Sequence, residues 1–232
     1  TPHLKIFREE RQRSVILCID TGPHMSFGTR GTFKSVQAAR AAALIGWAAR
    51  KQHDRVGGGL FGNPATGLRY VRATPGRRGL WRLLRFLTEP VELGDTDESS
   101  LMAALQHLES GSGTGSLIFV IAPVNQVTGG LERILGNLRQ RHDVVLLPVD
   151  DPADRDLPAV GSVIFSNAAG ELLEVDTDDE AGRAAFREDW EQRREELKQL
   201  SYRLRLGLIP ISTNEDVHRS LVSGLRQYAG RR

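Results

Sequence analysis

The chain has a single cysteine, Cys18, among its 232 residues, so it cannot form an internal disulfide. A protein without disulfides fits a reducing compartment, and we expect a cytoplasmic location. No apolar run approaches the roughly 18 residues that a membrane-spanning helix needs, and the first residues show no signal-peptide pattern. We therefore expect no membrane span in this chain.

Neither sign of charge dominates, because 31 basic residues stand against 29 acidic ones. A net charge of +2 is too small to predict nucleic-acid binding by itself. The hydrophobic fraction of 40% and the charged fraction of 26% are typical of a globular protein. From the length of the chain we expect residues 1–232 to be a single domain. Since the chain opens at Thr1 and not at methionine, we expect it to be the C-terminal fragment of a longer chain.

Motifs for catalysis and for cofactor binding are also missing. There is no Gly-x-Ser-x-Gly elbow, no His-Glu-x-x-His pair and no ligand spacing among the six histidines. The segment 28–35 has Phe33 where a phosphate loop needs glycine before Lys34. The acidic segment 176–180 lacks the later glycine and glutamate of a calcium loop. The sequence therefore predicts that the protein is not an enzyme and has no small-molecule substrate.

The most informative segment that is present runs from Ser14 to Asp20, where apolar residues lead directly into an aspartate. A strand that is apolar at consecutive positions is covered on both faces, as in the parallel sheets of α/β proteins. Open sheets of this kind bind ligands just beyond the carboxyl ends of their strands. Asp20 is therefore predicted to lie at the binding edge of the fold.

Further apolar runs alternate with amphipathic stretches, which predicts one doubly wound, mostly parallel, Rossmann-like α/β sheet flanked by helices. We expect strands at 14–20, 54–61, 67–73, 117–124, 143–149 and 205–211. A small hairpin near 162–176 is predicted as an appendage of the sheet. In the first helix, Val36 and Trp47 are predicted to face inward. Capping boxes at 177–180 and 212–215 are predicted to begin the last two helices.

With these elements in place, the sequence resembles the bacterial DUF58 family, whose core looks like a von Willebrand factor A domain. The resemblance covers essentially the whole chain and rests on four segments: 2–11, Phe33-Lys34-Ser35, Asp54-Arg55-Val56-Gly57 and Ile211-Ser212-Thr213. It implies a protein that works beside a MoxR-type AAA ATPase, as an adaptor in the assembly or maturation of other complexes.

In the wider fold the first strand ends in Asp-x-Ser-x-Ser, and these side chains help to hold Mg²⁺ through hard oxygen ligands. This chain keeps Asp20, but Gly22 and His24 stand at the two serine positions. An imidazole is a poor ligand for Mg²⁺.

Two more ligands of the family's site come from later segments. Ser99 falls where the family has a threonine, with Thr96 as a rival in another register, and Pro123 stands at the second aspartate. The resemblance therefore implies a degenerate metal-ion-dependent adhesion site. We expect no metal and no other cofactor there, and any remaining metal site would use Asp20 and Ser99.

A second candidate surface is basic. From Arg55 to Thr88 there are seven arginines and no acidic residue. The bland interpretation is a solvated basic face, and the alternative is a docking surface for an acidic partner protein, because arginine is enriched at interfaces. The residues of this second surface are Arg69, Arg72, Arg77, Arg78, Arg82 and Arg85.

The sequence thus favours a non-enzymatic protein-interaction or adaptor module whose partner is an AAA ATPase of the MoxR type. Two alternatives remain open: a magnesium-dependent ligand-binding domain, and a nucleic-acid-binding module that uses the arginine-rich surface. A hydrolase is disfavoured because no third group is visible beside Asp20 and His24. The partner-binding edge is predicted to consist of Asp20, Gly22, His24, Ser99 and Pro123.

Overall fold

A run of apolar and β-branched residues makes Ser14–Asp20 (β1) a central strand of a six-stranded sheet. The computed structural model describes residues 12–91, 99–111, 113–166 and 171–230, so the motif at 2–11 lies outside the described residues. The strand order is β3-β2-β1-β4-β5-β9, and every neighbouring pair is parallel except β2 and β3. The other strands are β2 (Arg55–Phe61), β3 (Arg69–Thr74), β4 (Leu117–Ile121), β5 (Asp143–Leu147) and β9 (Gly207–Leu208).

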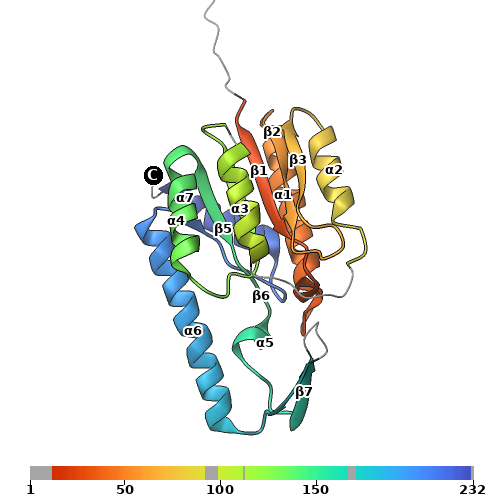
Figure 1. Cartoon of the computed structure of the whole chain (residues 1–232), viewed down its shortest axis with the longest axis vertical. Helices are drawn as coiled ribbons and strands as arrows, with labels where there is room; N and C mark the ends of the chain where they lie inside the picture. Colours follow the sequence, from red (N-terminus) through yellow and green to blue (C-terminus); the bar gives the residue numbers. More distant parts are fainter. Residues whose placement is uncertain (1–11, 92–98, 112, 167–170, 231–232) are drawn as a thin grey trace, which may run out of the picture.

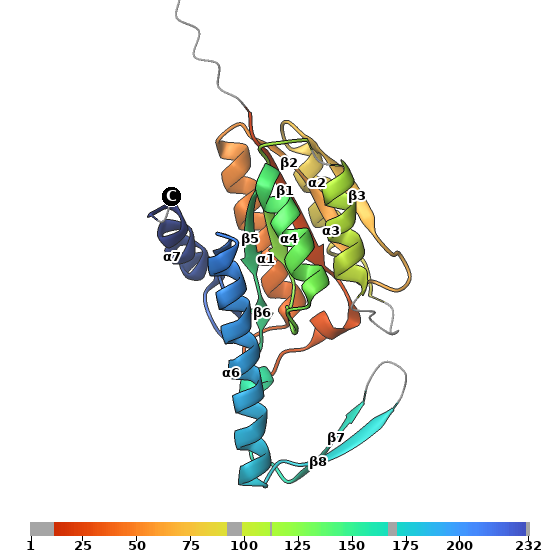
Figure 2. The same cartoon turned by 60° about the vertical axis from the view of Figure 1, so that its left-hand side comes forward.

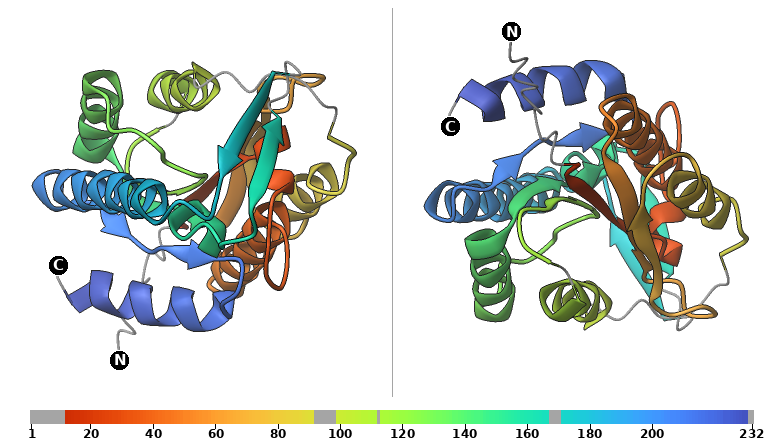
Figure 3. Two further views of the ribbon diagram at one scale, coloured as in Figure 1. Left: turned by 90° about the horizontal axis from the view of Figure 1, so that it is seen from below. Right: turned by 90° about the horizontal axis from the view of Figure 1, so that it is seen from above.

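Helices cover both faces of this sheet (Figures 1 and 3). One face is covered by α1 (Lys34–Lys51), α2 (Arg78–Phe86) and α7 (Val217–Gly230). The other is covered by α3 (Ser99–Gly111), α4 (Gly129–Arg141) and the C-terminal half of α6 (Glu180–Arg203). The predicted α/β class with a mostly parallel sheet is confirmed.

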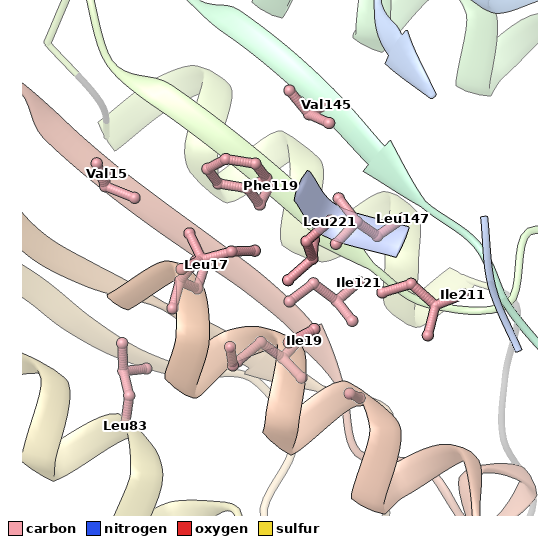
Figure 4. Close-up of a cluster of buried hydrophobic side chains, with 14 of the residues drawn as sticks. Val15, Leu17, Ile19, Leu83, Phe119, Ile121, Val145, Leu147, Ile211 and Leu221 are labelled. Carbon is pink, nitrogen blue, oxygen red and sulfur yellow. The ribbon is translucent and has the colours of Figure 1, made fainter. Parts of the chain in front are cut away.

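The core is divided by β1, whose side chains alternate between the two faces. Val15, Leu17 and Ile19 pack toward α1 and α7 (Figure 4), whereas Ile16 and Cys18 pack toward α3 and α4. Burying each of the larger side chains contributes about 2 kcal/mol to the free energy of unfolding. The sheet is therefore a rigid support for the loops at its carboxyl-end edge.

Several short elements lie beyond this edge. They are η1 (Pro23–Ser26), β6 (Val149–Asp150), α5 (Pro152–Arg155), the hairpin strands β7 (Ser162–Ser166) and β8 (Leu172–Asp176), and β10 (Ile211–Ser212). The hairpin and the first half of α6 project away from the sheet (Figure 2). The predicted hairpin is confirmed, but it forms a two-stranded sheet of its own.

Two predicted strands prove to be broken by proline. The strand expected at 143–149 ends at Leu147 and resumes as β6 after Pro148, and the strand expected at 205–211 is divided by Pro210 into β9 and β10. Proline has no N–H to donate to a ladder, so each strand leaves the main sheet there. The two pieces beyond the breaks, β6 and β10, then pair with each other.

Both predicted capping boxes were wrong in register. Helix α6 is capped by Asp179, whose carboxylate accepts from the N–H groups of Ala181 and Gly182 at 3.1 Å each. Helix α7 is capped by Asp216, which accepts from the Arg219 N–H at 2.7 Å. The two residues expected as caps have other partners: the Thr177 hydroxyl donates to the Gly161 carbonyl and the Ser212 hydroxyl donates to Asn214 Oδ1.

In α1 the expected inward face was half right. Trp47 packs against the core, whereas Val36 is exposed. The helix turns small residues inward instead, including Ala38, Ala41 and Ala42. These allow a close approach, and a Cβ added at Gly46 would lie 2.3 Å from a Leu80 methyl carbon of α2.

Candidate functional site

Asp20 ends β1 at the carboxyl-end edge of the sheet, as predicted, and is only 6% exposed. The chain turns immediately after it, because Gly22 and Pro23 lead into the short helix η1. The Thr21 N–H and hydroxyl both donate to the Phe61 carbonyl at 2.8 Å, which fastens the turn to β2. The carboxylate is therefore held at a fixed place under the edge.

Both carboxylate oxygens of Asp20 have partners within the same turn. Oδ1 accepts from the Gly22 N–H at 2.8 Å, and Oδ2 lies 2.9 Å from His24 Nε2. The Asp20 side chain is also enclosed from β2, since a Cβ added at Gly62 would lie 2.6 Å from Oδ1. Gly62 has a φ of +84°, which favours glycine.

The remaining residues of the predicted edge are placed less completely. Pro123 follows β4, which is the neighbour of β1 in the sheet, and brings no oxygen side chain to the edge. Ser99 is the first residue of α3, and its side chain lies outside the described part of the structure, as does the whole of Thr96. Among the described residues, Asp20, Gly22 and His24 are therefore the predicted residues that lie together.

A cavity of about 40 Å³ adjoins the Asp20 carboxylate. This volume suits one or two water molecules and no larger ligand. Arg69 of the predicted basic surface lines the cavity, forms an ion pair with Glu89 and lies over the Phe86 ring at 5.0 Å. Arg69 therefore joins the Asp20 site to the basic surface, and its charge is already paired.

The other five arginines of the basic surface extend over β3 and α2. Arg72, Arg77, Arg78, Arg82 and Arg85 are exposed. No ion pair is formed by these five within the described residues. Trp81 lies among them with 56% exposure and packs edge-on against Trp47 at 6.1 Å. The α2–β3 surface thus combines exposed positive charge with an exposed aromatic ring.

A second buried carboxylate at the same edge was missed by the sequence analysis. Asp151 follows β6 and is 2% exposed. Its side chain accepts from the Thr29 N–H at 2.8 Å, from the Thr29 and Thr213 hydroxyls, and from the Ala153 N–H at 3.0 Å. Burial raises the pKa of Asp151, but the hydrogen bonds from Thr213, Thr29 and Ala153 bring it below its ordinary value.

Charged neighbours surround Asp151 on both sides. Lys34 at the start of α1 lies 2.7 Å from an Asp154 carboxylate oxygen. Arg194 of α6 binds both carboxylate oxygens of Asp150 and donates to the Val124 carbonyl at 2.6 Å. Burial raises the pKa of Asp150 above its ordinary value, against the opposing effect of Arg194. These ion pairs and the hydrogen bonds of Asp151 together hold α1, α5, α6 and the β10–α7 connection close to Asp151.

No catalytic centre is evident among the described residues. None of their His, Cys, Asp and Glu side chains form a group of three suited to holding a metal ion. Cys18 is fully buried, and burial raises the pKa of its thiol, so it is no nucleophile. His142 is buried at the opposite edge, and burial lowers the pKa of its ring. Within the described ranges, no helix has the length and apolar character to cross a bilayer.

Comparison with sequence families gives a match over most of the chain. A family model described as "Protein of unknown function DUF58" matches residues 1–196. An uncharacterized protein of Mycobacterium tuberculosis (strain ATCC 25618 / H37Rv) is 27% identical over 189 residues, which are 80% of this chain and 57% of that protein. The same figures apply to an uncharacterized protein of Mycobacterium bovis. The chain thus spans little more than half the length of these relatives.

Comparison with solved structures agrees on the fold. The conserved hypothetical protein BatB from Bacteroides thetaiotaomicron superposes with a TM-score of 0.53 at 12% identity, over 94% of this chain and 99% of that chain. A von Willebrand factor type A structure from Catenulispora acidiphila has a TM-score of 0.53 at 9% identity, over 94% of this chain and 42% of that chain. At these identities the likeness establishes a von Willebrand factor A-like fold.

Proposed function

The chain belongs to the DUF58 family, and from that premise we propose that it is a non-enzymatic protein-interaction module. Its von Willebrand factor A-like fold is one that often mediates protein interactions. Within that class, our specific proposal is an adaptor for an AAA ATPase of the MoxR type, as the family resemblance implies. In this proposal the ATPase partner determines which client complexes are assembled or matured.

The observation that carries this proposal is the state of the Asp20 carboxylate. One of its oxygens accepts from the Gly22 N–H and the other lies against His24, both within one turn of the chain. Mg²⁺ prefers six oxygen ligands in near-octahedral geometry. At this edge Gly22 and Pro123 offer no side-chain oxygen and His24 offers an imidazole. Because too few oxygen ligands remain for Mg²⁺, we interpret this edge as a degenerate adhesion site. The arrangement supports recognition of a protein surface without a metal.

Two surfaces are available for such recognition. The first is the edge around Asp20, where the His24 side chain is 37% exposed and so is accessible to a partner. The second is the α2–β3 surface with its five exposed arginines. A partner with acidic groups fits the second surface, and charge complementarity raises the association rate most strongly at low salt.

The test is a binding titration with a purified MoxR-type AAA ATPase from the same organism. We expect the full chain to bind, and we expect at least about tenfold weaker binding for His24→Ala or for the Arg77→Glu/Arg78→Glu double variant. The matched control is Arg219→Glu/Arg226→Glu on α7, which makes the same charge change on exposed residues elsewhere.

The outcomes separate the parts of the proposal. Absence of binding by the unaltered chain would exclude the ATPase partnership. Binding that neither variant weakens would show that both proposed surfaces are wrong. Retention on single- or double-stranded DNA at low salt that is lost in Arg77→Glu/Arg78→Glu would favour the nucleic-acid alternative.

A further inference from the structure

The β7–β8 hairpin exposes apolar side chains to an unusual degree. Of the thirteen large apolar side chains that are exposed in the described residues, five lie between Val160 and Leu173. Four of these are more exposed than Trp81: Val160, Ile164 and Leu173 at 63% each and Leu172 at 71%. An isolated two-stranded hairpin is marginally stable in water, and exposed apolar clusters mark interaction sites.

The register of the hairpin divides its exposed apolar side chains between two faces, with Phe165 and Leu173 on one and Ile164 and Leu172 on the other. Val163 lies opposite Val175, and Phe165 lies opposite Leu173. Because side chains alternate along a strand, these four share one face of the hairpin, which is entirely apolar. The opposite face is mixed, since Ile164 lies opposite Glu174 there.

The charge of the hairpin segment is of one sign, and Glu174 and Asp176 project from the mixed face, beside Ile164 and Leu172. Between Arg155 and Arg183 the sequence has seven acidic residues and no basic one. Within the hairpin and the turn into α6, the exposed acidic residues include Glu174, Asp176 and Glu180. A surface that covers this mixed face must therefore offer apolar contact beside basic groups.

The α2–β3 surface of the same protein has this complementary character. Trp81 of α2 is 56% exposed, and the exposed Arg78, Arg82 and Arg85 lie on the same helix. The segment from Arg55 to Thr88 has no acidic residue, the reverse of the hairpin segment. In both Figures 1 and 2, α2 flanks the sheet while the hairpin lies beyond the carboxyl-end edge, well apart from it.

We propose that the β7–β8 hairpin of one molecule docks on the α2–β3 surface of a second copy of this chain. The mixed face of the hairpin would cover Trp81 with Ile164 and Leu172, and Glu174 and Asp176 on that face would pair with the arginines of α2. The contact joins two different surfaces, so it produces a two-fold dimer where both hairpins dock reciprocally, and rings or open chains where they do not. The α2–β3 surface is also the second surface of the proposed function. This inference does not depend on the ATPase partnership, because self-association requires no ATPase.

The first test is sedimentation velocity of the full chain from about 5 to about 200 µM, a range that brackets micromolar affinity. At low salt we expect the average mass to rise with concentration beyond a monomer. At about 0.5 M salt, where surface charges are screened within a few ångströms, we expect this association to weaken at least tenfold. A monomer at every concentration in low salt would overturn the proposal.

Charge-reversal variants locate the contact. Two variants are each expected to be monomeric, because each reverses the charge on one side of the contact: Glu174→Lys/Glu180→Lys on the hairpin side and Arg78→Glu/Arg82→Glu on α2. All four residues are exposed, so their substitution leaves the core unchanged. A mixture of the two variants is expected to associate, since an acidic hairpin then meets a basic α2. Thermal unfolding of each variant checks that it is folded.

The matched control is again Arg219→Glu/Arg226→Glu, which should associate as the unaltered chain does. Association that survives in both single-surface variants, or a mixture that stays monomeric, would overturn the assignment. ATPase binding is measured separately, so a monomeric chain that binds the ATPase refutes this inference alone, and a self-associating chain that does not bind it refutes the ATPase partnership alone.

Discussion

Asp20 and Asp151 are two buried aspartates at the same edge of the fold, and their surroundings differ. Asp20 is 6% exposed and its partners lie two and four residues along the chain. Asp151 is 2% exposed, and two of its partners, Thr29 and Thr213, are 122 and 62 residues away. One carboxylate shapes its own turn, and the other joins distant segments.

This difference separates recognition from stability at the edge. The contacts of the Asp20 carboxylate can change without loosening the sheet, because they lie within the turn, and Thr21 separately fastens the turn to β2. The Asp151 contacts join the loop after η1, the start of α5 and the connection to α7. We infer that Asp151 holds the frame on which the Asp20 turn is displayed.

The largest expected effect follows from removing Asp151. In Asp151→Ala the buried Thr213 hydroxyl and the part-buried Thr29 and Ala153 N–H groups lose their acceptor, and an unsatisfied buried donor costs about 1 to 3 kcal/mol. We expect the free energy of unfolding to fall by about 3 kcal/mol, measured by urea denaturation.

Asp20→Ala is the comparison variant for that measurement. Its loss should be smaller, about 1 kcal/mol, because the turn keeps its backbone bonds from Thr21 to Phe61. A loss at Asp20 equal to or larger than the loss at Asp151 would contradict the division between the two carboxylates.

A substitution at Gly62 tests how tightly the Asp20 carboxylate is enclosed. Alanine there must adopt a φ near +84° and would place its Cβ 2.6 Å from Asp20 Oδ1. We expect Gly62→Ala to lower the free energy of unfolding by about 2 kcal/mol, of which about half is backbone strain. Gly76→Ala is the matched control, with a φ of +78° and no atom within 4 Å of the added Cβ. Equal losses in the two variants would mean that the carboxylate is not enclosed.

The sequence predicted the fold and the Asp20 turn because both depend on neighbouring residues. An apolar run gives a buried strand, and the aspartate, glycine and proline after it give the turn. Within the hairpin, two short apolar segments around Ala169-Gly170 were enough to predict the strands that flank it. A feature that is determined by neighbouring residues can therefore be located from the sequence alone.

Asp151 was missed because its partners are remote in sequence. Thr213 was predicted only as an inner residue of the capping box at 212–215, but its hydroxyl donates to Asp151. The available local signal was Asp151-Pro152, since an aspartate before a proline is typical of a helix N-cap. That signal identifies the cap of α5, and only the folded chain brings Thr29 and Thr213 to the same carboxylate.

Acid titration sharpens the comparison from the Asp151 side. Hydrogen bonds hold the pKa of Asp151 below its ordinary value of 3.8. The stabilising contribution of the ionised carboxylate is therefore complete above that value and is lost as the pH falls below it, when the unfolded chain takes up the proton first. We expect the loss of stability between about pH 5 and about pH 2 to be smaller in Asp151→Asn than in the unaltered chain. An identical loss in both would contradict this account of the Asp151 carboxylate.

The smallest expected effect is that of magnesium on the unaltered chain. With few oxygen side chains beside Asp20, a dissociation constant above about 10 mM is expected, and 5 mM Mg²⁺ would then stabilise the fold by no more than about 0.25 kcal/mol. For a domain of this size such a change moves the melting temperature by less than about 1 °C.

The matching gain-of-binding variant is Gly22→Ser/His24→Ser/Pro123→Asp, which restores oxygen side chains at three positions. Gly22 has a φ of −68° and a ψ of 164°, so serine fits there without backbone strain. We expect the melting temperature of this variant to rise with Mg²⁺, because Asp20 would then share the ion with new ligands from its own turn and from the end of β4. A rise of several degrees in the unaltered chain would instead establish Asp20 as a working metal ligand, and the contrast with Asp151 would become one between a metal site and a structural one.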